Sequence, residues 1–275
     1  MAKRPVKLWQ EMATTDFAGL DPERAVVVLP VAAIEQHGPH LPLCVDACIN
    51  QGIVDEVLRR LPDDLTAIFL PLMPIGKSNE HDAFPGTLSL SAETLIRVWT
   101  EIGEGVARAG LRKLVIVNSH GGQPQIMDIV ARDLRVRLGM FVVTVGYGGL
   151  GRPLGLFPEH ELRHGIHGGS SETSQMMYLR PELVRDAERR NFVPLSAEME
   201  REYAYLQPEG RIGFGWQTQD LHPAGACGNA LDADAERGRL TIEHAAERFI
   251  ELLREVERFP LSALRPAPSG RGSIE

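Results

Sequence analysis

Glu35, His37 and Asp46 follow the first strongly apolar run of the chain and have side chains that can bind metal. The run Ala25–Val31 leads into Ala33-Ile-Glu-Gln-His-Gly-Pro-His40, and Asp46 comes nine residues after His37. Side chains two positions apart in an extended segment point the same way, so Glu35 and His37 can converge on one point. Carboxylates and imidazoles are typical ligands of Zn, Mn and Fe(II). The spacing therefore predicts that Glu35, His37 and Asp46 hold a divalent metal ion.

A structural interpretation of the same loop is also open. Asp46 is expected at the N-cap position of the next helix, where a carboxylate accepts backbone N–H groups. Glu35 can pair with an arginine. Each residue alone fits this alternative, but the three together in one strand-end loop favour the metal site.

A second candidate loop contains His120. It directly follows the apolar run Lys113–Asn118 and precedes Gly121 and Gly122. Two glycines leave the space beside the imidazole open, which a histidine of the core does not need. We predict His120 as a further metal ligand. Asn118 and the backbone amides of Gly121 and Gly122 are predicted to orient the substrate or to bind an oxyanion.

Two further loops carry histidine next to carboxylate. In Ser78–Leu90, Glu80 and His81 can ligate a metal, but the proline and glycine after them favour a shaped pocket wall, so His81 is predicted to contact substrate. Farther along, His167 precedes Glu172 and a predicted helix. Glu172 either interacts with the helix dipole or turns inward as a ligand.

The elements that must position these loops alternate between apolar, β-branched runs and longer amphipathic stretches. Strands are predicted at 25–31, 67–72, 113–118 and 140–145, and helices at 47–61, 92–109, 124–138, 172–179 and 233–258. This alternation indicates a parallel sheet covered by helices on both faces. Functional sites in such sheets lie beyond the carboxyl ends of the strands, where the candidate loops are.

The rest of the chain is less regular, and no internal domain boundary is evident. Residues 185–232 are predicted to form an excursion over the sheet. Residues 1–259 are predicted to form a single domain. The segment 260–275, rich in proline, glycine and serine, is predicted to be a mobile tail.

Composition narrows the partners and the location. The 275 residues carry a formal net charge of −8, which argues against nucleic acid as a partner. No apolar run approaches the roughly 20 residues of a membrane span, and no secretory signal is visible. Three cysteines without CxxC spacing indicate neither a disulfide framework nor a zinc finger. We predict a cytoplasmic protein that binds neither nucleic acid nor membrane.

Four motifs, in this order, together resemble one family. They are Glu35-Gln-His-Gly-Pro-His-Leu-Pro-Leu43 with Asp46, Phe84-Pro-Gly-Thr-Leu-Ser-Leu90, Asn118-Ser-His-Gly-Gly122 and His167-Gly-Gly-Ser-Ser-Glu-Thr-Ser174. The chain is similar to the creatininase (creatinine amidohydrolase) family. The resemblance implies a three-layer α/β/α fold with a mostly parallel sheet, two divalent metal ions per chain (Zn or Mn, with Fe also possible) and a homohexamer.

The resemblance also implies roles for individual residues. Glu35 and His120 would hold one ion and His37 the other, with Asp46 bridging both, and His167 would assist proton transfer. Two departures stand out. Gly122 occupies the position where creatininase has a metal-binding glutamate, and Glu172 is the candidate to replace that ligand. No tryptophan lies in 145–166, where creatininase closes its pocket with tryptophans, which argues against creatinine as the substrate.

The predicted function is hydrolysis of a non-peptide C–N bond in a cyclic amide, a formamide or a related small amide. A hydroxide activated by two metal ions attacks, and His167, or less favourably Glu172, carries the proton to the leaving nitrogen. Alternatives are creatinine amidohydrolase proper, a peptide-trimming enzyme of redox-cofactor maturation, and a binding or regulatory protein on the same scaffold. A nucleotide-binding Rossmann protein lacks support, because no GxGxxG follows the first strand.

Overall fold

The computed structural model describes residues 7–210 and 212–266. Its centre is a sheet of four parallel strands in the order β2-β1-β3-β4. The strands are β1 (Val26–Val31), β2 (Ala67–Phe69), β3 (Lys113–Asn118) and β4 (Phe141–Gly146). The predicted parallel sheet is confirmed, with strand ends shifted by one to three residues.

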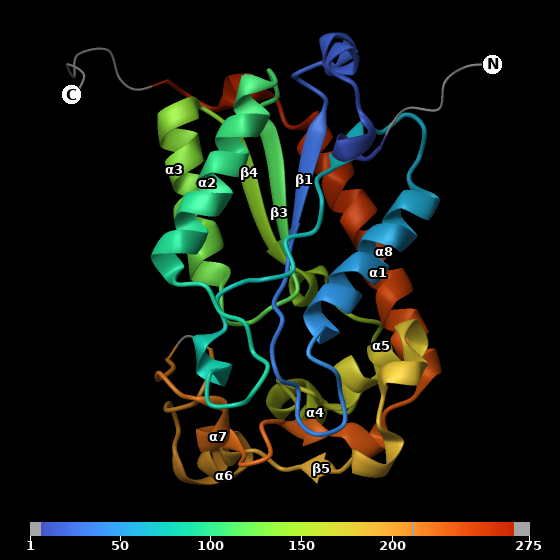
Figure 1. The fold of residues 1–275 in the computed structure, drawn as a ribbon, viewed down its shortest axis with the longest axis vertical. Helices are drawn as coiled ribbons and strands as arrows, with labels where there is room; N and C mark the ends of the chain where they lie inside the picture. The colour runs from blue at the N-terminus through green and yellow to red at the C-terminus, as the bar shows by residue number, and fades with distance from the viewer. Residues whose placement is uncertain (1–6, 211, 267–275) are drawn as a thin grey trace.

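Helices cover both faces of this sheet (Figure 1). One face is covered by α1 (Val45–Arg60) and α8 (Ala235–Arg258), against which α5 (Ser170–Leu179) packs. The other face is covered by α2 (Ala92–Arg108) and α3 (Pro124–Leu138). The three-layer α/β/α architecture is therefore as predicted.

Alternate side chains of each inner strand enter different cores. Val26 and Val28 of β1 pack beneath α1 and α8, whereas Val27, Leu29 and Val31 pack beneath α2 and α3. Successive side chains of a strand point to opposite faces of the sheet, so a strand covered on both sides must be apolar throughout. This explains the unbroken apolar runs that identified the strands.

The segment beyond the carboxyl ends of the strands differs from its prediction. Figure 1 shows α4 (Glu159–His164), β5 (Asn191–Phe192), α6 (Leu195–Glu202) and α7 (Thr218–Leu221) below the sheet, at its end rather than over a face. A short antiparallel pair joins β5 to β6 (Gly228–Asn229). These elements therefore build a wall beyond the strand ends, where the candidate loops lie.

Two predictions concern the ends of elements. The N-cap prediction for Asp46 is wrong: Cys44 is the N-cap of α1, and Asp46 is the second residue inside the helix. Its carboxylate is thus not used for capping.

Within the predicted tail, Leu261–Ala263 form a short 3-10 turn with Leu261 buried, and 267–275 lie outside the described residues. The mobile tail stays a prediction.

Asn50 of α1 attaches this helix to the ends of two strands. Its Nδ2 donates to the carbonyl oxygens of Val31 at 2.8 Å and Val117 at 3.1 Å, and the residue is buried. Asp46 lies one turn before Asn50 in α1. These bonds therefore fix the position of the Asp46 carboxylate relative to the ends of the strands.

We expect Asn50→Leu to lower the free energy of unfolding of the metal-free protein by about 1–3 kcal/mol, because buried carbonyls lose their partner. Urea unfolding measures this, with Gln51→Leu on the exposed side of the same helix as the control. A loss no larger than that of the control would contradict the role assigned to Asn50.

Candidate metal centre

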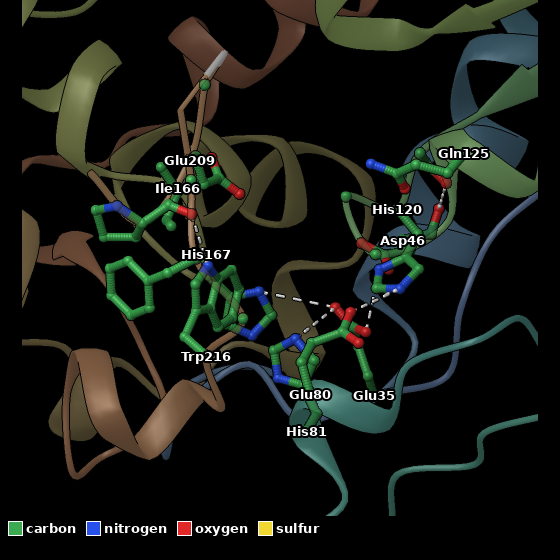
Figure 2. A pocket seen from close by; sticks show the side chains of 18 of the residues that line it. Glu35, Asp46, Glu80, His81, His120, Gln125, Ile166, His167, Glu209 and Trp216 are labelled. Atoms are coloured by element: carbon green, nitrogen blue, oxygen red, sulfur yellow. Dashed lines mark hydrogen bonds and ion pairs between the residues drawn. The ribbon is translucent and has the colours of Figure 1, made fainter. Parts of the chain in front are cut away.

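Loops from four parts of the chain place acidic and histidine side chains around one point (Figure 2). Two of these parts are the loops after β1 and β3, and the other two are the first turns of α1 and α5 with the residues just before them. We call this group the acid–histidine cluster: Glu35, His37, Asp46, His120, His167 and Glu172. Every predicted metal ligand and both predicted proton carriers are therefore brought together.

His37 presents one ring nitrogen to three carboxylates. Its Nε2 lies 3.4 Å from Asp46 Oδ1, 3.7 Å from Glu172 Oε2 and 3.8 Å from Glu35 Oε1. Its Nδ1 lies 3.1 Å from the backbone carbonyl of Glu35 and can only donate there. Nδ1 therefore carries a proton in either state, and Nε2 is the nitrogen that faces the carboxylates, where it can hold a second proton or bind a metal ion.

His120 faces the same carboxylates from the other side. Its Nδ1 lies 3.1 Å from Glu35 Oε2 and 3.3 Å from Asp46 Oδ2. Its Nε2 lies 2.8 Å from the carbonyl of Lys77 and donates to it, so the lone pair is on Nδ1. Asp46 thus presents one oxygen to each imidazole, which is the geometry of a bridging ligand.

The cluster contains polar atoms that protein contacts leave unpartnered. Within the described residues, His37 Nε2 and Asp46 Oδ2 are buried and form no hydrogen bond. Three triplets among the described residues have ligand atoms within 4.8 Å of one another: Glu35, His37 and His167; Glu35, Glu80 and His120; and His37, Asp46 and Glu172. Buried groups without partners are rare unless something else satisfies them, and a bound divalent cation would do so here. The donor set fits divalent metal binding.

The charges of the cluster shift its pKa values strongly. Burial alone would lower the pKa of His37, but the Asp46, Glu172 and Glu35 carboxylates raise it to about 10. The pKa of His120 is likewise raised well above its usual range against the effect of burial. Burial alone would raise the pKa of Asp46, but the two imidazoles hold it at about 2. Without metal, protons on the histidines balance the carboxylates.

These shifts predict that metal binding releases protons. At neutral pH the metal-free His37 is protonated, since its pKa is about 10, and an ion bound at its Nε2 displaces that proton. We expect at least one proton released per chain and a metal affinity that falls as the pH falls. Titration calorimetry in buffers of different ionisation enthalpy measures this; a heat independent of the buffer would contradict it.

His167 differs from the other imidazoles of the cluster. Its Nε2 donates to the carbonyl of Gln36 at 2.7 Å, and its Nδ1 lies 3.7 Å from Glu35 Oε1. A backbone bridge to Cys227 fixes its loop. Burial, and then the charge of His37, lower the pKa of His167 well below its usual range. His167 is therefore neutral, with a free Nδ1 that can accept a proton.

Glu172 reaches the cluster from the first turn of α5. Its Oε2 accepts the backbone N–H of Gly168 at 2.6 Å and lies 3.7 Å from His37 Nε2. Gly168 has a φ of 64°, and a Cβ there would lie 3.1 Å from the carbonyl of His37. Glycine is thus required where this loop passes the first one. The placement agrees with Glu172 as the candidate replacement ligand.

A cavity of about 540 Å³ opens above the cluster. His81, Gly121 and Gly122 line it, as predicted for substrate contact. The Nδ1 of His81 lies 2.8 Å from Thr218 Oγ1, which fixes the ring. Asn118 does not reach the cavity: its Oδ1 accepts the N–H of His120 and shapes that loop instead.

Three contributors to the site were not predicted. Ser78 donates its hydroxyl to Glu35 Oε2, and Glu80 lies beside His120. Trp216 lines the cavity (Figure 2). The sequence did contain a signal for Glu80, because its carboxylate directly precedes the imidazole of His81. No local pattern indicated Trp216, since it comes from the irregular segment.

Comparison with known proteins decides the family. The family model described as creatinine amidohydrolase matches residues 10–253. The chain belongs to the creatininase family. The nucleotide-binding alternative is thereby replaced, and the four motifs are those of a creatininase-family site.

Two relatives and two solved structures illustrate the range of this family. A mycofactocin precursor peptide peptidase from Mycobacterium ulcerans is 30% identical over 241 residues, covering 86% of this chain and 87% of the relative. The creatinine amidohydrolase of Pseudomonas putida is 30% identical over 268 residues, covering 90% and 94%. A manganese form of creatininase superposes with a TM-score of 0.71 at 25% identity, covering 92% of this chain and 100% of that one. A variant of Zn-Zn type gives 0.73 at 25%, covering 92% and 99%.

None of the helices in residues 7–210 and 212–266 combines the length and apolar character needed to cross a bilayer.

Proposed function

We propose that this creatininase-family protein is a metal-dependent hydrolase that cleaves a C–N bond of an amide. We further propose that two divalent ions, zinc or manganese, are held by Glu35, His37, Asp46, His120 and Glu172. The observation that carries the proposal is the pair of buried, unpartnered atoms His37 Nε2 and Asp46 Oδ2 at the centre of the cluster. Relatives described as hydrolases, and creatininases in manganese and zinc forms, support it.

The ions, when bound, supply a hydroxide near neutral pH and polarise the carbonyl group. The side chains around them do the rest. Neutral His167 has a free Nδ1 that can accept a proton and deliver it to the leaving nitrogen, and its lowered pKa makes the protonated ring a strong acid for that second step. Gly121 lines the cavity beside His120, where its backbone N–H can orient the carbonyl oxygen. Glu172 is the less favoured proton carrier, because His37 and Gly168 already engage it.

The size of the cavity favours a second candidate within the same reaction class. About 540 Å³ falls among pockets that accept drug-sized ligands, and a creatinine-sized ring would leave most of it to water. A larger amide or a short peptide fills it better, in keeping with relatives described as peptide peptidases. The non-enzymatic alternative would predict missing ligands, yet every predicted ligand is present in the cluster.

Elemental analysis and a substrate panel test this function. Protein loaded with zinc or manganese should contain near two equivalents of metal per chain. It should hydrolyse members of a panel of cyclic amides, formamides and short peptides. Protein that takes up no metal, or that holds metal but is inactive on every class, would contradict the proposal. High activity on creatinine alone would replace it with creatinine amidohydrolase.

The proposal includes a cytoplasmic location and a homo-oligomer, by resemblance a hexamer. Sedimentation analysis of the full chain tests this, and a monomer at micromolar concentration would contradict it.

A further inference from the structure

Glu80 lies on the outer side of His120, away from the centre of the cluster. It belongs to a single 3-10 turn, Asn79–His81, whose backbone is held where Thr218 Oγ1 donates to the Glu80 carbonyl at 3.1 Å. Its Oε1 lies 3.3 Å from His120 Nε2, and its Oε2 lies 3.7 Å from Lys77 Nζ. Figure 2 shows this carboxylate among the side chains around Glu35.

Gly122 makes room for this arrangement. A Cβ at position 122 would overlap Glu80 Oε1 and lie 2.5 Å from His120 Nε2. The backbone of Gly122 has no positive φ, so the position needs glycine for space and not for conformation. Because any side chain here would displace the carboxylate or the imidazole, the glycine and the Glu80–His120 contact depend on each other.

The contact determines which nitrogen of His120 is free. The Nε2–H is shared between the carbonyl of Lys77 at 2.8 Å and the carboxylate of Glu80 at 3.3 Å, neither of which can donate to it. The lone pair is therefore on Nδ1, which faces Glu35 and Asp46. A carboxylate behind a metal-binding imidazole fixes its tautomer and orientation and makes it a better donor.

We propose that Glu80 is a positioning residue that holds His120 with Nδ1 directed at the metal and strengthens it as a ligand. This inference rests on the proposed function. In this role Glu80 is not itself a metal ligand, although one of its oxygens belongs to a triplet of atoms that lie close enough together to bind an ion. A nitrogen that carries a proton cannot bind metal, and Glu80 lies on that side of the ring.

Metal affinity, measured by chelator competition on the full chain, tests the inference with zinc as the probe. In Glu80→Ala, the affinity of one of the two sites should fall by about 10- to 100-fold, while saturating zinc still gives two equivalents. Glu80→Gln should lose less, because its amide oxygen can still accept the N–H. Glu209→Gln, the same change on the opposite wall of the cavity, is the matched control and should keep the affinity.

The outcomes of these measurements distinguish a positioning role for Glu80 from a ligand role and from no role. An unchanged affinity in Glu80→Ala would overturn the positioning role. A loss of one equivalent at saturation in both variants would also overturn it, by making Glu80 a ligand. A weaker affinity at one site with an unchanged number of bound zinc ions, partly rescued in Glu80→Gln, is a result that a merely structural role would not give. If the wild type itself binds no zinc, the proposed function fails first, and the two failures are thus distinguishable.

Discussion

Replacing Asp46 by alanine is expected to remove metal and hydrolysis together, the largest effect of any single substitution in the cluster. Asp46 presents one oxygen to His37 at 3.4 Å and the other to His120 at 3.3 Å, and both contacts are shorter than 3.5 Å, whereas Glu35 lies 3.8 Å from His37. Without it, both sites lose a ligand and the two histidines lose a counter-charge. We expect turnover to fall by on the order of 10³-fold or more, since the activated hydroxide is lost.

Elemental analysis and steady-state kinetics on metal-treated protein measure this loss. Asp46→Asn preserves the volume of the buried side chain and separates ligand loss from a packing defect. Asp55→Ala, on the exposed side of the same helix, should keep both metals and full activity. Two equivalents of metal with normal turnover in Asp46→Ala would show that the assignment is wrong.

Replacing His167 by glutamine should have the second-largest effect, and of a different kind. His167 has a free Nδ1 and a lowered pKa, and its Nε2 is occupied by the carbonyl of Gln36. Glutamine cannot take up and deliver the proton. We expect kcat to fall by about 10²- to 10⁴-fold while the metal content remains that of the wild type.

His160→Gln provides the matched control, because His160 is an exposed histidine of α4. It should leave kcat and metal content unchanged. If His167→Gln instead lost one equivalent of metal, His167 would be a ligand, as its distance to Glu35 and His37 also allows. Unchanged kcat would remove it from proton transfer altogether.

The strands and the loops that follow them could be predicted because their signals are local. An inner strand of a covered parallel sheet has to be apolar on both sides, so β1 and β3 can be recognised in the sequence as unbroken apolar runs. The polar residues directly after them, Glu35, His37 and His120, then stand out by contrast. Their convergence follows from the parallel topology, because carboxyl ends of parallel strands share one edge.

Local patterns misplaced the cap of α1 and the role of Asn118. Asp46 was expected both as a metal ligand and at the N-cap, but the N-cap is Cys44, two residues earlier, so the Asp46 carboxylate takes no part in capping. Asn118 was expected to contact substrate, but its side chain accepts the N–H of His120 and shapes that loop. A shift of two residues and a single hydrogen bond therefore decide between a structural and a functional position.

The sequence by itself determined the fold class, the family resemblance and the identity of the donor atoms, since these depend on residue types and on short spacings. Only the tertiary structure decided which nitrogen of each imidazole faces the carboxylates, that Glu80 fills the space left at Gly122, and that Trp216 lines the cavity. Those features join residues far apart in the chain. Their positions depend on side-chain packing and hydrogen-bond geometry, which a one-dimensional pattern does not contain.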